Sequence, residues 1–372
     1  MTTTPSPRNL PPDVPRDLPA GAPDSGPAAS APGLRLASPA SVLAAVPSLL
    51  GFHPSRSLVV LGVSGPRDRV SLVFRYDLPD AADDDLTADI AAHASEVLAR
   101  EAIPAAIVIG YGAAGPVAHV TAPVVRALLD AGLDIIEILR AQDGRYYSGT
   151  CQNPGCCPAE GTAFDPCSHP AAAVLSEAGL DVLPDRAALA RTLQPPPGMV
   201  AATRQATSRA VRKLGRLVTM ARRDGLDPAA ALADAGRAAV RDAISRYRAG
   251  APAQDRARLA FLAVVLADLR VRDDAWAMMD ARHAGRHMAL WTDIVTAAAP
   301  EFVPAPASLL AFTAWQAGQG AMANVAVERA LAADPAYSMA LLIATAVQAG
   351  LPPSAARLPM TPEEVAASYE AG

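Results

Sequence analysis

The sequence predicts an α/β unit, with a mixed sheet and flanking helices, followed by an all-α, tetratricopeptide-like helical domain. Up to about residue 195, short apolar runs such as residues 57–63 alternate with amphipathic stretches, which is the pattern of an α/β layer. After Pro195-Pro196-Pro197-Gly198 the apolar residues recur at helical spacing. Aromatic residues are only 4% of the chain, although hydrophobic residues are 51%. This composition favours closely packed, alanine-rich helices.

A length of 372 residues is enough for two units that each bury a core. Residues 1–33 contain nine prolines and few large apolar residues, which is typical of a disordered tail. We therefore expect a disordered tail over 1–33, an α/β domain with a cysteine loop over 34–195, and a helical repeat-like domain over 199–353. Residues 354–372 are a tail with a short helix, begun by the capping box from Thr361 to Glu364.

The first elements are a helix and a hairpin. Ser38 caps a helix that starts at Pro39 and ends at Gly51. The apolar run 57–63 has the pattern of a strand buried on both faces. Only a short turn separates it from the alternating run 70–78, and a short connection predicts an antiparallel pair.

The next elements alternate between helices and strands. Helices are predicted at 83–100 and from a Thr121 cap to Ala131, and strands at 105–110, 134–139 and 145–148, with Asp143-Gly144 as the last hairpin turn. A loop rich in Cys, Pro and Gly covers 150–170. Short helices follow at 171–178 and 186–193.

The helical domain begins with predicted helices at 209–223, 228–248, 256–269, 274–282 and 287–298, with Asp273 as the cap of the fourth. Beyond Pro304, small residues and a closing proline fall at the spacing of one tetratricopeptide repeat: Gly318, Ala323, Val327, Ala330 and Pro335. The aromatic residues of the first helix of that repeat are not at their places. The prediction is a repeat-like helical bundle.

Several segments resemble an actinobacterial domain-of-unknown-function (DUF) family. Its opening is similar to Gly51-Phe52-His53-Pro54 followed by Ser57-Leu58-Val59-Val60-Leu61-Gly62. Later matches are Arg75-Tyr76-Asp77-Leu78-Pro79, Cys151 with Cys156-Cys157-Pro158, Val271-Arg272-Asp273 and the helical run 290–353. The likeness covers residues 34–353. It implies a bacterial source, in agreement with Lys213 being the only lysine beside many arginines, and it implies no particular reaction.

The charge of the chain disfavours some classes of function. A net charge of −5 and a pI of about 5.7 argue against a general nucleic-acid binder, which needs a basic surface. Residues 204–223 are locally basic, but such a run is usually a solvated helix face. The sequence shows neither a signal peptide nor an apolar run of about 18 residues. We therefore expect a cytoplasmic protein with mostly reduced thiols and no membrane span.

The cysteine loop is the strongest candidate for chemistry. All four cysteines lie between residues 151 and 167. Zinc prefers four thiolate or imidazole ligands, and Cys151, Cys156 or Cys157, Cys167 and His169 could supply them. The adjacent Cys156 and Cys157 are not expected to face one metal together. A thiol–disulfide switch, or cysteines that only pack as small hydrophobes, are the alternatives.

A second candidate site is the entrance to the first strand. His53 could act as a base or ligand, with Arg75 and Asp77 at the end of the paired strand. A histidine oriented by a carboxylate is a catalytic arrangement and also an ordinary structural hydrogen bond. His283 and His287 are four residues apart, and we interpret them as a surface pair on one helix.

The segment Gly110-Tyr111-Gly112-Ala113-Ala114-Gly115 fits the G-x-G-x-x-G pattern of dinucleotide-binding folds. Its third glycine should lie in the first turn of a helix, whereas the predicted helix starts only at Thr121. Arg140 also stands where an acidic residue is expected. The better interpretation is a flexible glycine loop.

These observations lead to one expected function and two alternatives. We expect a ligand-binding or protein-interaction scaffold, with a protein partner for the helical domain. The alternative is a metal- or thiol-dependent enzyme that uses the loop from Cys151 to Cys167, with zinc as the possible cofactor. A weaker alternative is nucleotide binding at the Gly110 loop. The sequence leaves open whether the protein is an enzyme.

Overall fold

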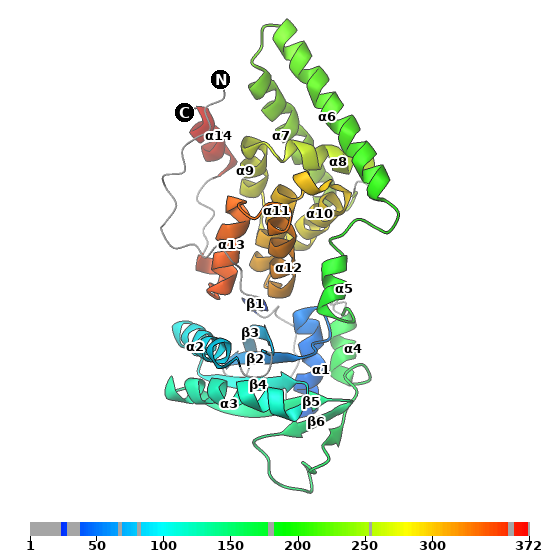
Figure 1. The fold of residues 1–372 in the computed structure, drawn as a ribbon. Coiled ribbons are helices and arrows are strands. Elements are labelled where there is room, and N and C mark those ends of the chain that lie inside the picture. Colours follow the sequence, from blue (N-terminus) through cyan, green and yellow to red (C-terminus); the bar gives the residue numbers. More distant parts are fainter. Residues whose placement is uncertain are drawn as a thin grey trace.

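The computed structural model describes residues 24–27, 38–65, 69–79, 83–177, 182–252, 255–355 and 361–370. The sheet and its helices form the lower half of Figure 1, and the helical region forms the upper half. The predicted combination of a mixed α/β part and a mostly helical part is confirmed. Among the described residues, no helix is long and apolar enough to cross a membrane.

The sheet contains seven strands in the described part of the chain, in the order β1-β3-β2-β4-β5-β6-β7. The strands are β1 (Asp24–Pro27), β2 (Ser57–Ser64), β3 (Arg69–Asp77), β4 (Ala105–Tyr111), β5 (Asp134–Gln142), β6 (Arg145–Ser148) and β7 (Thr162–Ala163). Among the described strands, β4 and β5 are the only pair that runs parallel. Strand β1 belongs to the segment predicted as a tail, and it pairs with β3. Residues 1–23 and 28–37 of that segment and its surroundings lie outside the described residues.

Strand β2 lies between β3 and β4 and is buried on both faces. Leu58 and Val60 join the core with α2 (Asp84–Arg100) and α3 (Ala114–Asp130), whereas Val59 and Leu61 join the core with α1 (Pro39–Leu50). Burial on both sides explains why the strand is apolar without alternation. The predicted antiparallel pairing with the next strand is confirmed.

Helix α1 has the predicted ends. The Ser38 hydroxyl accepts a hydrogen bond from the Ser41 amide (3.2 Å), and the Ser41 hydroxyl accepts one from the Ser38 amide (3.0 Å). Gly51 closes the helix with φ of 80°, a left-handed conformation that glycine adopts without strain.

Helix α3 begins at Ala114, so the predicted start at Thr121 is wrong. Ala113 precedes the helix in an extended conformation and supplies no capping side chain. Pro116 lies in the first turn, where its missing N–H would have no partner within the helix. The glycine segment therefore does lead directly from β4 into a helix, and α3 connects the parallel strands β4 and β5.

The helical region follows the short helices α4 (Pro170–Glu177) and α5 (Arg186–Arg191). Its α-helices are α6 (Val200–Arg223), α7 (Pro228–Arg248), α8 (Arg256–Val265), α9 (Leu269–Ala277), α10 (Ala284–Ala297), α11 (Pro304–Gln316), α12 (Gly320–Leu331), α13 (Ser338–Gln348) and α14 (Pro362–Glu370). Short 3₁₀ turns are η1 (Ala281–His283), η2 (Pro300–Phe302) and η3 (Pro353–Ala355).

Two predicted details of this region need correction. Helix α9 is capped by Asp268, whose carboxylate accepts from the Arg270 amide (2.8 Å), and not by Asp273. Asp274, predicted as the first residue of a helix over 274–282, instead lies buried in the middle of α9. The capping box at Thr361 is confirmed. The Thr361 amide donates to the Glu364 carboxylate, and the Glu364 amide donates to the Thr361 hydroxyl. The tetratricopeptide-like spacing remains a prediction.

The two parts share one hydrophobic core. Side chains of α1, β2 and β4 belong to the same buried cluster as those of α10, α11 and α12. His93 Nε2 lies 2.6 Å from the Gln348 carbonyl oxygen, and Arg100 donates to the Gly350 carbonyl oxygen (2.7 Å). The segment 195–198, predicted as the domain boundary, lies between α5 and α6. The α/β part before it and the helical part after it nevertheless pack against each other, with β1 contacting α12 and α13 (Figure 1).

Candidate functional site

The cysteine loop joins β6 to β7 at the end of the sheet that lies farthest from the helical region (Figure 1). The Cys151 amide donates to the Ser148 hydroxyl (2.9 Å), which fixes the start of the loop. The Asn153 carbonyl oxygen accepts from the amides of Cys156 (3.2 Å) and Cys157 (2.8 Å). This tight turn brings the second and third cysteines back toward the first.

The Sγ atoms of Cys151, Cys156 and Cys157 all lie within 4.8 Å of one another. The Sγ atoms of Cys151 and Cys156 are 3.2 Å apart. Adjacent Cys156 and Cys157 were not expected to face one metal easily, but the turn at Asn153 brings both thiols close to Cys151. This arrangement of three soft ligand atoms could hold a metal ion.

The three thiols share their protons unequally. The pKa of Cys151 is lowered, first by a backbone hydrogen bond with Asn153 and then by the thiols of Cys156 and Cys157. The hydrogen bond to Cys151 raises the pKa of Cys156, and raises the pKa of Cys157 to about 12. Cys151 is therefore the first to become a thiolate, and its negative charge opposes ionisation of the other two. A bound cation would remove that opposition.

Cys167 and His169 are not part of this three-thiol cluster. Cys167 Sγ lies 4.0 Å from His53 Nε2. His169 Nδ1 accepts from the Ala171 amide (3.2 Å) at the start of α4. Of the five predicted metal ligands, the structure thus brings three together and places the other two elsewhere.

Of the residues predicted at the entrance to β2, the structure pairs Arg75 with Asp77 but places His53 elsewhere. Arg75 forms an ion pair with Asp77, and its Nε donates to the Ser57 hydroxyl (2.9 Å). Within the described chain, no hydrogen bond or ion pair joins His53 to Asp77, and the His53 ring lies instead beside Cys167. The predicted histidine–carboxylate pair is not formed.

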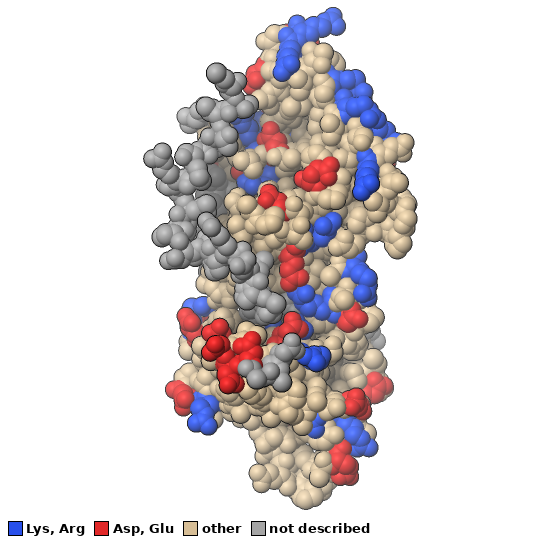
Figure 2. All heavy atoms as spheres, viewed as in Figure 1, with Lys and Arg blue, Asp and Glu red and all other residues tan. Residues whose placement is uncertain are grey.

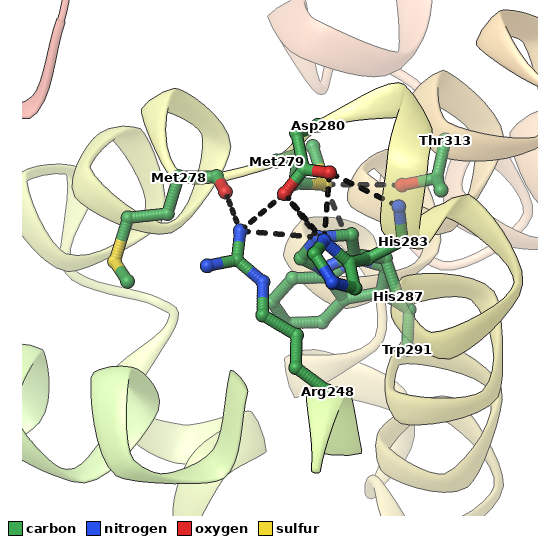
Figure 3. A network of polar contacts seen from close by, with 8 residues as sticks. All are labelled: Arg248, Met278, Met279, Asp280, His283, His287, Trp291 and Thr313. Atoms are coloured by element: carbon green, nitrogen blue, oxygen red, sulfur yellow. Dashed lines mark hydrogen bonds and ion pairs between the residues drawn. The ribbon is translucent and has the colours of Figure 1, made fainter. Parts of the chain in front are cut away.

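A polar network lies inside the helical region around Asp280 (Figure 3). Asp280 accepts from Arg248 (2.6 Å) and from the His283 amide (3.0 Å), and its Oδ2 lies 3.6 Å from His287 Nε2. His287 is only 1% exposed, so the predicted surface pair of histidines is wrong. His283 ends η1, whereas His287 lies on the buried face of α10.

This network predicts a loss of stability in mild acid. Burial and the Arg248 charge lower the pKa of His287, so the unfolded chain binds this proton more readily than the folded one. The stability gained from neutral His287 is fully present above the ordinary histidine pKa of about 6.5. It is lost as the pH falls below that value and through the lowered pKa of His287 in the folded protein. His93, whose pKa burial also lowers, acts in the same direction.

We expect the melting temperature to fall between pH 7 and pH 5, and to fall less in a His287→Gln variant. Differential scanning calorimetry at several pH values measures both slopes. His119→Gln, which changes an exposed histidine on α3, is the matched control. Equal slopes for the wild type and His287→Gln would show that His287 does not carry the effect.

Comparisons with known proteins identify a family but no function. A family model described as "Domain of unknown function (DUF4192)" matches residues 39–354. Neither the curated proteins nor the solved structures gave a match.

Proposed function

We propose a metal-binding function for this chain, which belongs to the family described as a domain of unknown function (DUF4192). The bound ion is a thiophilic divalent metal, with zinc as the best fit, and the ligands are Cys151, Cys156 and Cys157. The observation that supports the proposal is the convergence of three Sγ atoms within 4.8 Å. Packing alone gives no reason for such a cluster, because Cys156 is exposed and the other two are partly exposed.

The chemistry of the donor atoms favours zinc over harder cations. Thiolates select zinc and other soft metals, whereas magnesium and calcium prefer oxygen ligands. When three cysteine thiols bind Zn²⁺, each binds as a thiolate and gives up its proton. The resulting centre has a net charge of −1. Three protein ligands leave the fourth tetrahedral position to water or to an outside ligand, as in catalytic zinc sites.

Thiol protection tests this proposal. In zinc-loaded protein we expect one of the four cysteines, Cys167, to react quickly with a chromogenic disulfide reagent, and the other three to react only after a chelator is added. Cys167→Ser should abolish the fast phase and keep the protected phase. Four thiols that react alike with and without chelator would refute the metal site.

The same experiment separates a metal from a thiol switch. A disulfide between Cys151 and Cys156 would remove two reactive thiols whether or not chelator is present, and a reductant would restore them. In the structure Cys151 and Cys156 are free thiols whose Sγ atoms lie 3.2 Å apart. Reduced thiols are the form in which a metal binds.

A protein-interaction role of the helical region is the second candidate. Helix α6 carries seven cations and no acidic residue: Arg204, Arg209, Arg212, Lys213, Arg216, Arg222 and Arg223. All seven are exposed, and no described carboxylate forms an ion pair with any of them. Figure 2 shows basic side chains along this edge of the molecule. An acidic protein surface is the partner that this local basic face would suit.

A further inference from the structure

A cavity of about 430 Å³ lies at the carboxyl ends of the parallel strands β4 and β5. Its lining comes from α1, from the loop before β2, from the residues that lead into α3, from the β5–β6 turn and from the segment after β7. Ligands of α/β proteins commonly bind at the carboxyl ends of parallel strands. The volume is in the range of small-molecule sites.

Tyr111, the last residue of β4, lines this cavity. Its hydroxyl group is buried and has no hydrogen-bond partner in the described part of the chain. Burial raises the pKa of this phenol above its ordinary value, so the group stays a neutral donor. A buried hydroxyl without a partner costs free energy. An acceptor atom of a ligand that displaced the atoms now covering the hydroxyl would remove that cost.

The cavity lining holds two guanidinium groups, Arg56 and Arg145, and one carboxylate, Asp143, so its charge favours an anion. Arg145 lines it, and its Nη1 donates to the carbonyl oxygens of Gly161 (2.7 Å) and Glu160 (3.4 Å). No carboxylate among the described residues pairs with Arg145. The Asp143 carboxylate, which also lines the cavity, accepts from the side-chain amide of Gln142 (3.0 Å).

The neighbouring backbone also presents positive groups. Ala113 lines the cavity and precedes α3 without capping it, and the amino end of a helix carries a partial positive charge.

The backbone at the cavity is also strained at one position. Arg56 lines the cavity with φ of 44°, which is rare for a bulky residue and is found at binding sites. Asp143 also has a positive φ, of 48°, but the hairpin turn with Gly144 accounts for it.

The rest of the lining is largely apolar. Leu43, Pro47, Pro54, Phe164 and Pro166 contribute to it. We infer that this cavity binds a small amphiphilic anion, in which a carboxylate or phosphate group is attached to an apolar body. Arg145 and the amino end of α3 attract the anionic group, the Tyr111 hydroxyl donates to it, and the apolar residues hold the body. This inference is independent of the metal centre, whose ligands do not line the cavity.

Isothermal titration calorimetry with phenylpropionate and phenyl phosphate tests the inference on the full-length protein. We expect saturable binding of at least one of them, and weaker or no binding of the uncharged phenylpropanol. The two anions distinguish a carboxylate site from a phosphate site.

Two substitutions should weaken binding of the preferred anion. Tyr111→Phe keeps the ring and removes the hydroxyl, and it should lower the affinity about fivefold without lowering the melting temperature of the free protein. Arg145→Gln should lower the affinity about tenfold or more. Arg126→Gln is the matched control, because Arg126 lines a different cavity of about 650 Å³ between α3 and β5.

Cys167 supplies an independent readout, since its Sγ lies 4.0 Å from the cavity-lining His53. Bound anion should slow modification of Cys167, measured by peptide mass mapping, while the protection of the metal cluster by zinc stays the same. The inference is overturned if neither anion binds at millimolar concentration, or if Tyr111→Phe and Arg145→Gln bind as tightly as Arg126→Gln.

Discussion

Replacing Arg241 with alanine is expected to lower the free energy of unfolding by about 2–3 kcal/mol, less than for a fully buried pair because the Arg241 side chain is 48% exposed. Arg241 in α7 forms an ion pair with Asp274 in α9, and its Nε donates to Oδ2 of that carboxylate (2.9 Å). The Asp274 side chain is 2% exposed, and Arg241 is its only side-chain partner in the described chain. Removing the guanidinium leaves a buried carboxylate without compensation.

Arg237→Ala is the matched control for this prediction. Arg237 lies one helical turn earlier in α7 and pairs with Asp234, which is 68% exposed. Loss of an exposed ion pair of this kind should change the free energy of unfolding by less than about 0.5–1 kcal/mol. Urea unfolding followed by circular dichroism compares the two variants. Similar losses for both would contradict the assignment of the α7–α9 contact to the buried pair.

Replacing Gly110 with alanine is expected to lower the free energy of unfolding by about 3 kcal/mol, at the upper end of the range for overpacking. A Cβ atom at this position would lie 2.1 Å from Cγ1 of Val117 in α3. Strand β4 and helix α3 would then have to separate. The glycine is therefore required for the close packing of the helix on the strand.

Gly115→Ala, in the same G-x-G-x-x-G segment, is the contrasting control. No atom lies within 4 Å of a Cβ added there, and alanine favours a helix over glycine by up to about 1 kcal/mol. We expect this variant to be as stable as the wild type or more stable. Val117→Ala should recover much of the loss in Gly110→Ala, because it removes the clashing methyl groups. Thermal unfolding of the wild type, Gly110→Ala, Val117→Ala and the variant that carries both substitutions measures this recovery. Additive losses in the variant with both substitutions would argue against the clash.

Much of the fold could be predicted from local patterns. The cap of α1, the apolar run of β2 and the short turn to β3 each carry a signal within a few residues. The start of α3 could not be predicted in this way, because Ala113 offers no capping group and the neighbouring glycines suggested a loop. Asp268 was missed as a cap because it lies in an apolar run, while the acidic pair after Arg272 looked like a better start.

The candidate sites depend more strongly on tertiary structure. Sequence proximity identified the cysteine loop, but the Asn153 turn that brings three thiols together is a matter of backbone geometry. The contact of His53 with Cys167 joins segments 114 residues apart. Tyr111 and Arg145, which line the proposed anion site, were not among the predicted site residues, although their positions at the end of β4 and after β5 were available as a signal.

The measurement that tests the central proposal most directly is the metal content of the intact chain by native mass spectrometry. The protein should be purified without a metal-affinity tag, incubated with a slight excess of zinc and then dialysed. We predict one zinc ion per chain for the wild type and for Cys167→Ser, and loss of the ion in Cys151→Ser and Cys157→Ser. A metal-free wild-type chain, or equal retention in all of these variants, would contradict a metal centre at Cys151, Cys156 and Cys157.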